Sequence, residues 1–292
     1  MAGRTGRTGR TRVTGRTGNT GRTGRTGSTG ATGGTGATAF STTAATPVTA
    51  TVAPGPELVR AATAAARGAL QPTGVTTNAV IDISHHNTVT SFAKVANDGI
   101  RGVIHKATQG TRFVDPLFES RRIQIENAGL LFGAYHFGTA GSGTDQAEHL
   151  LDTAGTDTLL VLDLEGNPQG FDMALEEAEE FVHHIFERTG RFPGLYSGHT
   201  IKEMLSAAGI RDPQQTVLSN CWLWIAQYGP RALIPTIWSR WTLWQYTDGA
   251  AGPLPHEVDG VGRCDRDRFN GTEEELIAFW NTGAPVVASA VA

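Results

Sequence analysis

The chain has 292 residues, 39% of them hydrophobic, and a formal net charge of −4. No apolar run approaches the roughly 20 residues of a membrane-spanning helix, so the composition is that of a globular protein without a membrane span. The first residues lack the apolar core of a signal peptide, so the sequence indicates no export route. Cys221 and Cys264 are the only cysteines, which excludes a disulfide framework and favours two free buried thiols over one bridge.

The net charge is unevenly distributed along the chain. Seven arginines precede the first acidic residue, Glu57, and the rest of the chain carries 17 basic and 28 acidic residues, a net charge near −11. An acidic body argues against nucleic acid as a partner.

Residues 3–38 repeat the triplet Gly-x-Thr, broken once at Arg12. Glycine at every third position is required by the collagen triple helix, but this stretch contains no proline. We therefore expect residues 1–56, which end in an Ala/Thr/Pro/Val linker, to be disordered; a trimerising or surface-tethering stalk is the alternative. The arginines of this tail have two open interpretations, either attraction to anionic wall polymers or no function.

The remaining domain boundaries follow from composition. Residues 57–75 are expected to form a short alanine-rich helix and a linker, and residues 283–292 a flexible C-terminus. Residues 76–282 are expected to form a folded barrel domain.

Within that domain, strand-like and helix-like segments alternate. The apolar or β-branched strand patterns lie at residues 79–84, 102–108, 131–137, 159–165, 194–197, 223–228, 242–247 and 264–269. The helical patterns lie at residues 91–98, 116–128, 146–153 and 174–189, the last ending before Gly190. This alternation predicts an α/β fold, an irregular (β/α) TIM-like barrel with short or missing helices late in the chain. A doubly wound open sheet is the alternative fold. The chain has neither a glycine-rich dinucleotide motif nor a phosphate-loop lysine motif, so no cofactor is expected.

The fourth of these strands ends in two carboxylates, Asp163 and Glu165. Side chains two apart on a strand share a face, so both acids enter one small volume. Repulsion and burial should raise at least one pKa, and an acid kept protonated beside a carboxylate is suited to cleaving a glycosidic bond. The structural alternative is that both acids cap loop amides or pair with arginines.

Other polar side chains occupy corresponding positions on other strands. In a barrel, the C-terminal ends of strands meet at one mouth, where catalysis occurs. The residues expected to converge there with the acid pair are Asp82, Tyr135, Tyr196 and Asp265; His136 ends the same strand as Tyr135.

Six ordered motifs resemble glycoside hydrolase family 25, the family of Chalaropsis-type lysozymes, over about residues 80 to 280. They are Ile81–Asn87 (IDISHHN), Ile104–Gly110 (IHKATQG), Gly133–Phe137 (GAYHF), Leu162–Glu165 (LDLE), Leu223–Tyr228 (LWIAQY) and Leu243–Thr247 (LWQYT). The resemblance implies an irregular (β/α) barrel that acts at the cell wall or periplasm. The implied reaction is hydrolysis of the β-1,4 bond between N-acetylmuramic acid and N-acetylglucosamine in peptidoglycan glycan strands. A catalytically inactive, glycan-binding barrel is the alternative.

The resemblance also assigns roles to residues. It implies that Glu165 is the general acid, that Asp163 is its partner and that Asp82 is the acid of the first strand. The implied sugar-site residues are Tyr135, Tyr196, Trp224 and Asp265. Four positions depart from the family pattern: Cys264 stands where valine is usual, Asp267 where asparagine is usual, Gln109 where glutamate is usual and His105 where an aliphatic residue is usual. Asp267 lies two residues after Asp265 and faces the same way, so it is the alternative to Asp265 for the last acid.

The mechanism has three alternatives. Retaining enzymes place their carboxyl groups about 5 to 5.5 Å apart and inverting enzymes about 6.5 to 9.5 Å apart, and neighbours on one strand fit the shorter range. The third route, which we favour, uses the substrate's own N-acetyl oxygen as nucleophile, with Asp163 orienting the acetamide. No metal site is expected, because His85–His86 and His183–His184 are sequence neighbours that point in different directions. Of the five tryptophans between Trp222 and Trp244, one or two are expected to face the sugar and the others the core.

Overall fold

The computed structural model describes residues 74–283. The Gly-x-Thr tail, the helix and nearly all of the linker expected within residues 57–75, and the C-terminal segment from residue 284 lie outside the described residues. The first strand begins at Thr77 and the last helix ends at Thr282.

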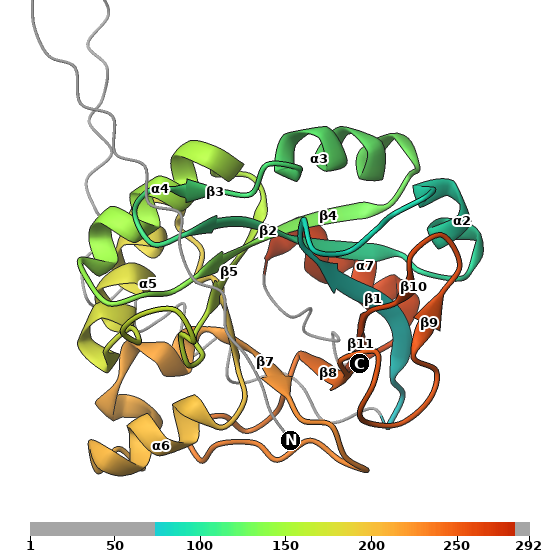
Figure 1. Cartoon of the computed structure of the whole chain (residues 1–292). Helices are drawn as coiled ribbons and strands as arrows, with labels where there is room; N and C mark the ends of the chain where they lie inside the picture. The colour runs from blue at the N-terminus through green and yellow to red at the C-terminus, as the bar shows by residue number, and fades with distance from the viewer. Residues whose placement is uncertain (1–73, 284–292) are drawn as a thin grey trace, which may run out of the picture. The chain divides into compact units, whose positions relative to one another are not determined.

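Eight strands of the described region form a closed barrel (Figure 1). Their order is β1-β11-β8-β7-β6-β5-β4-β2, and the pairing of β1 with β2 closes the ring. The strands are β1 (Thr77–Ile83), β2 (Gly102–Gln109), β4 (Leu131–Phe137), β5 (Leu159–Asp163), β6 (Gly194–Ser197), β7 (Trp222–Ala226), β8 (Leu243–Thr247) and β11 (Asp265–Phe269). All eight predicted strands are present, and the predicted irregular barrel is confirmed over the open sheet.

One strand of the ring, β11, runs against both of its neighbours, β1 and β8, whereas the other neighbouring pairs in the ring are parallel. The first residue of β11, Asp265, therefore pairs with Asp82 near the end of β1. An antiparallel strand brings its beginning, not its end, to the mouth of the barrel. The direction of β11 was not predicted from the sequence.

Three short strands lie outside the ring. The strand β3 (Phe113–Val114) extends β2, and β9 (Glu257–Val258) pairs with β10 (Gly262–Arg263) in a separate hairpin.

The four predicted helices are present as α2 (Phe92–Asn97), α3 (Phe118–Asn127), α4 (Gly143–Ala154) and α5 (Leu175–Thr189). Helix α5 begins with Glu176 and Glu177, which suit the helix dipole, and ends at Gly190, whose φ of 70° few other residues adopt. Helices α3, α4 and α5 lie outside the ring of strands (Figure 1). Helices α6 (Thr200–Ala207) and α7 (Glu273–Thr282) were not predicted. The expected shortage of helices late in the chain is nevertheless seen among the described residues. Only 3-10 turns separate α6 from β7, and no helix lies between β7 and β11.

Helix α7 packs against the barrel at the ends of the strands opposite the mouth. Its Trp280 donates an indole hydrogen bond of 2.8 Å to the carbonyl oxygen of Phe132, next to the start of β4. A Cβ atom on Gly102, the first residue of β2, would lie 2.6 Å from the same indole ring. The barrel interior is filled by apolar side chains of the strands and of α7, so it is a packed core and not a channel. These side chains include Val80, Ile104, Val161, Trp224, Leu276, Phe279 and Trp280.

Candidate active site

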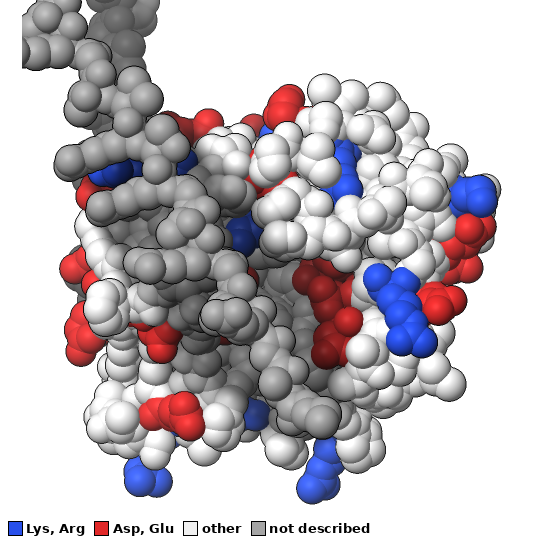
Figure 2. Space-filling view, viewed as in Figure 1, with Lys and Arg blue, Asp and Glu red and all other residues white. Residues whose placement is uncertain are grey.

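A cavity of about 230 Å³ lies at the ends of the strands that face away from α7. The residues that line it come from seven strands and from the loops that follow β5 and β7. They are Asp82, Tyr135, Asp163, Glu165, Tyr196, Trp224, Tyr228, Gln245 and Asp265. All seven residues proposed from the sequence as catalytic or sugar-binding are in this set. Aspartate and glutamate side chains gather in a hollow on the face viewed in Figure 2, which gives the site a strongly acidic character.

The acid pair lies at the end of β5, with Asp163 as its last residue and Glu165 two residues beyond it, and both side chains line the cavity, as the spacing predicted. Asp163 is buried, and one of its carboxyl oxygens, Oδ1, has no hydrogen-bond partner among the described residues. Burial raises the pKa of Asp163 well above its usual value, Glu165 raises it further, and Lys106 opposes the shift. Burial also raises the pKa of the half-buried Glu165. Glu165 can therefore keep a proton beside a second carboxyl group whose free oxygen is available to a ligand.

A hydrogen-bonded chain fixes the carboxyl group of Asp82 on the opposite wall. The side-chain amide of Gln245 donates a 2.8 Å hydrogen bond to Asp82 Oδ2. The amide oxygen of Gln245 accepts hydrogen bonds from the hydroxyl groups of Tyr196 at 2.9 Å and Tyr228 at 2.7 Å. Because both donors fix the Gln245 oxygen, its nitrogen must face Asp82. The position of Asp82 thus depends on residues from three other segments of the barrel.

Two aspartates of β11 lie close to Asp82 but differ in position. Asp265 lines the cavity, and burial, followed by the charges of Asp248 and Glu165, raises its pKa to about 6. Asp267 is fully buried behind the cavity wall, where its Oδ1 accepts a 2.6 Å hydrogen bond from the indole nitrogen of Trp224. Trp224 therefore presents part of its ring to the cavity while its polar atom is satisfied by β11.

One cation acts on the acid pair. The ammonium group of Lys106 donates a 2.7 Å hydrogen bond to Gln109 and lies 4.8 Å from the centroid of the Phe137 ring. Its charge lowers the pKa values of both Asp163 and Glu165. Gln109, which replaces the usual glutamate, supplies a neutral partner and leaves the positive charge available to the acids.

A second cavity of about 490 Å³ continues from the first beside α6. The two cavities share Glu165, Tyr196 and Tyr228, and the second is also lined by Lys202 and Gln227. The shared residues place Glu165 between the two spaces. A longer ligand can therefore extend to both sides of this acid.

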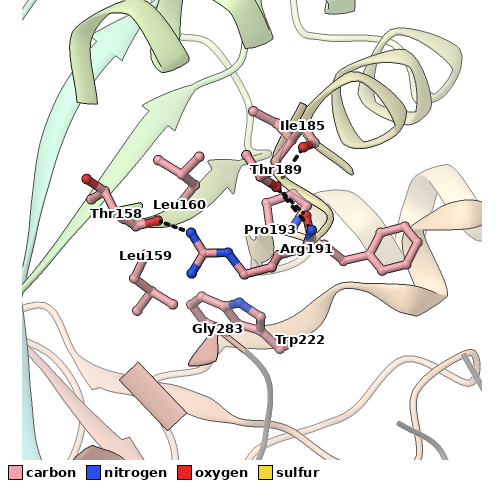
Figure 3. Close-up of a pocket in the computed structure, with 10 residues that line it drawn as sticks. Thr158, Leu159, Leu160, Ile185, Thr189, Arg191, Pro193, Trp222 and Gly283 are labelled. Carbon is pink, nitrogen blue, oxygen red and sulfur yellow. Dashed lines mark hydrogen bonds between the residues drawn. The ribbon is translucent and has the colours of Figure 1, made fainter. Parts of the chain in front are cut away.

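The small cavity in Figure 3 lies at the other end of the barrel, beside the start of β5 and Arg191. Its volume of about 10 Å³ is that of one water molecule at most, so it cannot hold a sugar.

Three residues of this site were not predicted from the sequence: Lys106, Tyr228 and Gln245. Each lies within a motif that was quoted for the family resemblance, and Lys106 is two positions after the buried Ile104 near the end of a strand. That spacing was the available signal for a side chain directed into the mouth. Conversely, His136, one residue after Tyr135, points away from the mouth and bonds Thr108 at 2.8 Å.

The remaining sequence expectations concern histidines, tryptophans and cysteines. His85 bonds Asp115 at 2.7 Å and His184 bonds Glu148 at 2.7 Å, and within residues 74–283 no group of three or more potential ligands is arranged to hold a metal ion. Of these five tryptophans, Trp224 alone lines the cavity that holds the acid pair. Both cysteines are free and buried, as expected. No described helix is long and apolar enough to cross a bilayer.

Comparisons with known proteins agree with this geometry. Residues 81–253 match the family model for glycosyl hydrolases family 25. The chain is 30% identical to "Lysozyme M1" of Streptomyces globisporus over 225 residues, which cover 70% of this chain and 71% of that protein. It is 29% identical to the "N,O-diacetylmuramidase" of Chalaropsis sp over 190 residues, 58% of this chain and 88% of the relative. The solved bacterial lysozyme of Streptomyces coelicolor superposes with a TM-score of 0.61 at 28% identity, covering 73% of this chain and all of that one. The matched segment contains the acid pair, Asp82 and five further strands of the barrel. The chain therefore belongs to glycosyl hydrolases family 25.

Proposed function

We propose that this protein is a lysozyme that hydrolyses the β-1,4 bond between N-acetylmuramic acid and N-acetylglucosamine in peptidoglycan. The observation that carries the proposal is the cavity lined by Asp82, Asp163 and Glu165, with a raised pKa on each acid. Family membership and the lysozymes among the similar proteins support the substrate.

Glu165 acts as the general acid. Burial raises the pKa of its half-buried carboxyl group, which favours the protonated form, and the proton is transferred to the glycosidic oxygen as the bond breaks. Its place between the two cavities allows sugars to bind on both sides of the cleaved bond. The ionised Glu165 then takes a proton from the water that completes hydrolysis.

Asp163 acts on the N-acetyl group of the sugar whose bond is broken. Its free Oδ1 accepts the acetamide N–H, and the acetamide oxygen attacks the anomeric carbon as the leaving oxygen departs. Water then opens the cyclic intermediate, which restores the acetamide and the starting anomeric configuration. The competing route is direct attack by Asp163 or Asp82. Substrates with an N-trifluoroacetyl group separate the routes, because a weaker acyl nucleophile slows the assisted route most.

Asp82 and Asp265 contribute negative charge on the wall opposite the acid pair. Asp82, held by Gln245, stabilises the positive charge that develops on the sugar ring. Tyr135, Tyr196 and Trp224 present aromatic surface and hydroxyl groups to the sugar.

The site of action is the cell wall or periplasm, where the substrate is found. The arginines of residues 1–56 attract anionic wall polymers to the acidic catalytic body, or the same segment trimerises. Neither role of the tail is required for the chemistry.

Turbidity loss of purified peptidoglycan, with mass spectrometry of the released ends, tests the function. Products with N-acetylmuramic acid at the reducing end are expected. Glycan binding without any new ends would identify an inactive, glycan-binding barrel and would refute the proposal.

A further inference from the structure

Asp82 and Asp267 form a pair of buried carboxyl groups with an unusual hydrogen-bond balance. Asp82 Oδ2 accepts from Gln245, and Asp267 Oδ1 accepts from Trp224. The two carboxyl groups lie within hydrogen-bonding reach of each other. Asp267 Oδ2 is buried, and no donor from the described residues faces it.

The charges around this pair do not compensate two carboxylates. On β11, Asp265 adds negative charge and Cys264 is a buried thiol, while Arg266, whose guanidinium bonds the carbonyl oxygen of Glu257, is the weakest of the influences on Asp267 and lowers its pKa. From β7 and β8, Asp267 and Asp82 meet only the neutral donors Trp224 and Gln245. No lysine or arginine of residues 74–283 forms an ion pair with either aspartate. Two adjacent buried carboxylates that form no ion pair are strongly disfavoured, and a shared proton removes one charge and supplies the missing donor.

We propose that Asp267 is a positioning residue whose Oδ2 shares one proton, in a hydrogen bond, with the free oxygen of Asp82. Asp82 then faces the substrate with both of its oxygens fixed, by Gln245 and by Asp267, and the pair carries one negative charge. Asp82, which borders the cavity, accepts from Gln245, and the fully buried Asp267 accepts from Trp224, so the pair keeps one proton and one negative charge between its two facing oxygens. This inference rests on the proposed function for its kinetic consequences, but the proton itself can be observed without any activity.

Infrared spectroscopy provides that observation. Glu165→Gln removes the other acid expected to be protonated, and mildly alkaline pH ionises Asp265, whose pKa is about 6. In this background we expect Asp267→Asn to abolish one carboxylic-acid C=O stretching band. The matched control Asp265→Asn, two residues away on the same strand, should leave that band in place. Identical spectra with and without Asp267→Asn would overturn the proposal.

Kinetics test the positioning role in the otherwise unmodified enzyme. An asparagine amide can donate permanently to Asp82 and accept from Trp224, whereas leucine can do neither. We expect Asp267→Leu to lower kcat by about 10²-fold with a smaller change in KM, because Asp82 is no longer held, and Asp267→Asn to restore most of that loss. An Asn variant that folds normally but is as impaired as the Leu variant would overturn the proposal. If the Leu variant does not fold, the kcat of the Asn variant relative to the unmodified enzyme decides: a loss of about 10²-fold overturns the proposal.

The two measurements also separate this inference from the proposed function. An unmodified enzyme that cleaves no peptidoglycan refutes the function, while the infrared comparison still decides whether Asp82 and Asp267 share a proton.

Discussion

Lys106 near the end of β2 lowers the pKa of Asp163 at the end of β5, although β4 lies between the two strands. The ammonium group also bonds Gln109 at 2.7 Å. Burial and Glu165 act on Asp163 in the opposite direction and raise its pKa. The protonation of the acid pair is therefore a balance between burial, mutual repulsion and one lysine.

Replacing this lysine should move the pH profile of the enzyme. The reaction needs Asp163 ionised and Glu165 protonated, so activity rises through the pKa of the first and falls through that of the second. Lys106→Met removes a charge that lowers both pKa values, and we expect both limbs of the kcat–pH profile to move to higher pH. The control is Lys94→Met, an exposed residue on α2. A shift to lower pH would show that Lys106 does not act through these acids.

Loss of the general acid should abolish catalysis without affecting the fold. Glu165→Gln keeps the shape of the side chain but cannot donate a proton, and we expect turnover to fall by about 10² to 10⁴-fold while glycan binding persists. Glu187→Gln, an exposed position on α5, is the matched control. Near-normal turnover by Glu165→Gln would remove this residue from the mechanism.

The stereochemistry of the first product tests the arrangement of the acid pair. Neighbouring acids on one strand leave little room for an attacking water, so we expect two displacements and net retention. Proton NMR of the product, recorded before mutarotation, should show the β-anomer first. Initial formation of the α-anomer would mean that Asp163 or Asp82 activates water directly.

The closure of the barrel by α7 should contribute substantially to stability. Trp280→Ala removes a buried ring and leaves the carbonyl oxygen of Phe132 without its donor. We expect the free energy of unfolding to fall by about 3–5 kcal/mol, measured by urea denaturation. Ile277→Ala, on the exposed side of the same helix, should cost far less. Equal losses for the two variants would contradict the role assigned to Trp280.

The N-terminal tail should be dispensable for folding and chemistry. A Gly/Thr/Arg tract has almost nothing to bury, so deletion of residues 1–56 should leave the Tm and the hydrolysis of short soluble glycans unchanged. Binding to whole walls should weaken, most of all at low salt, where charge attraction is least screened. Replacing the seven arginines by glutamine in the full chain tests whether their charge is what binds the wall. Sedimentation of the full chain would detect trimerisation. A large fall in Tm on deletion would show that the tail stabilises the fold.

The local pattern of the sequence determined the strands and the acid pair. A run such as Leu159–Asp163 has no polar residue before its end, so it can only be a buried strand or helix segment, and its length and flanking glycine favour the strand. Because the period of a strand is two residues, Asp163 and Glu165 had to share a face whatever the rest of the fold. The six family motifs supplied the remaining site residues.

Tertiary structure decided what depends on contacts between distant segments. Strand direction leaves no trace in a five-residue pattern, so the antiparallel β11, and with it the approach of Asp265 and Asp267 to Asp82, appears only once the ring has closed. The hydrogen bonds of Gln245 join residues up to 163 positions apart. Protonation is decided at the same level: the sequence shows how many acids the chain has, but burial and neighbouring charge, which exist only in the folded barrel, determine which of them keep a proton.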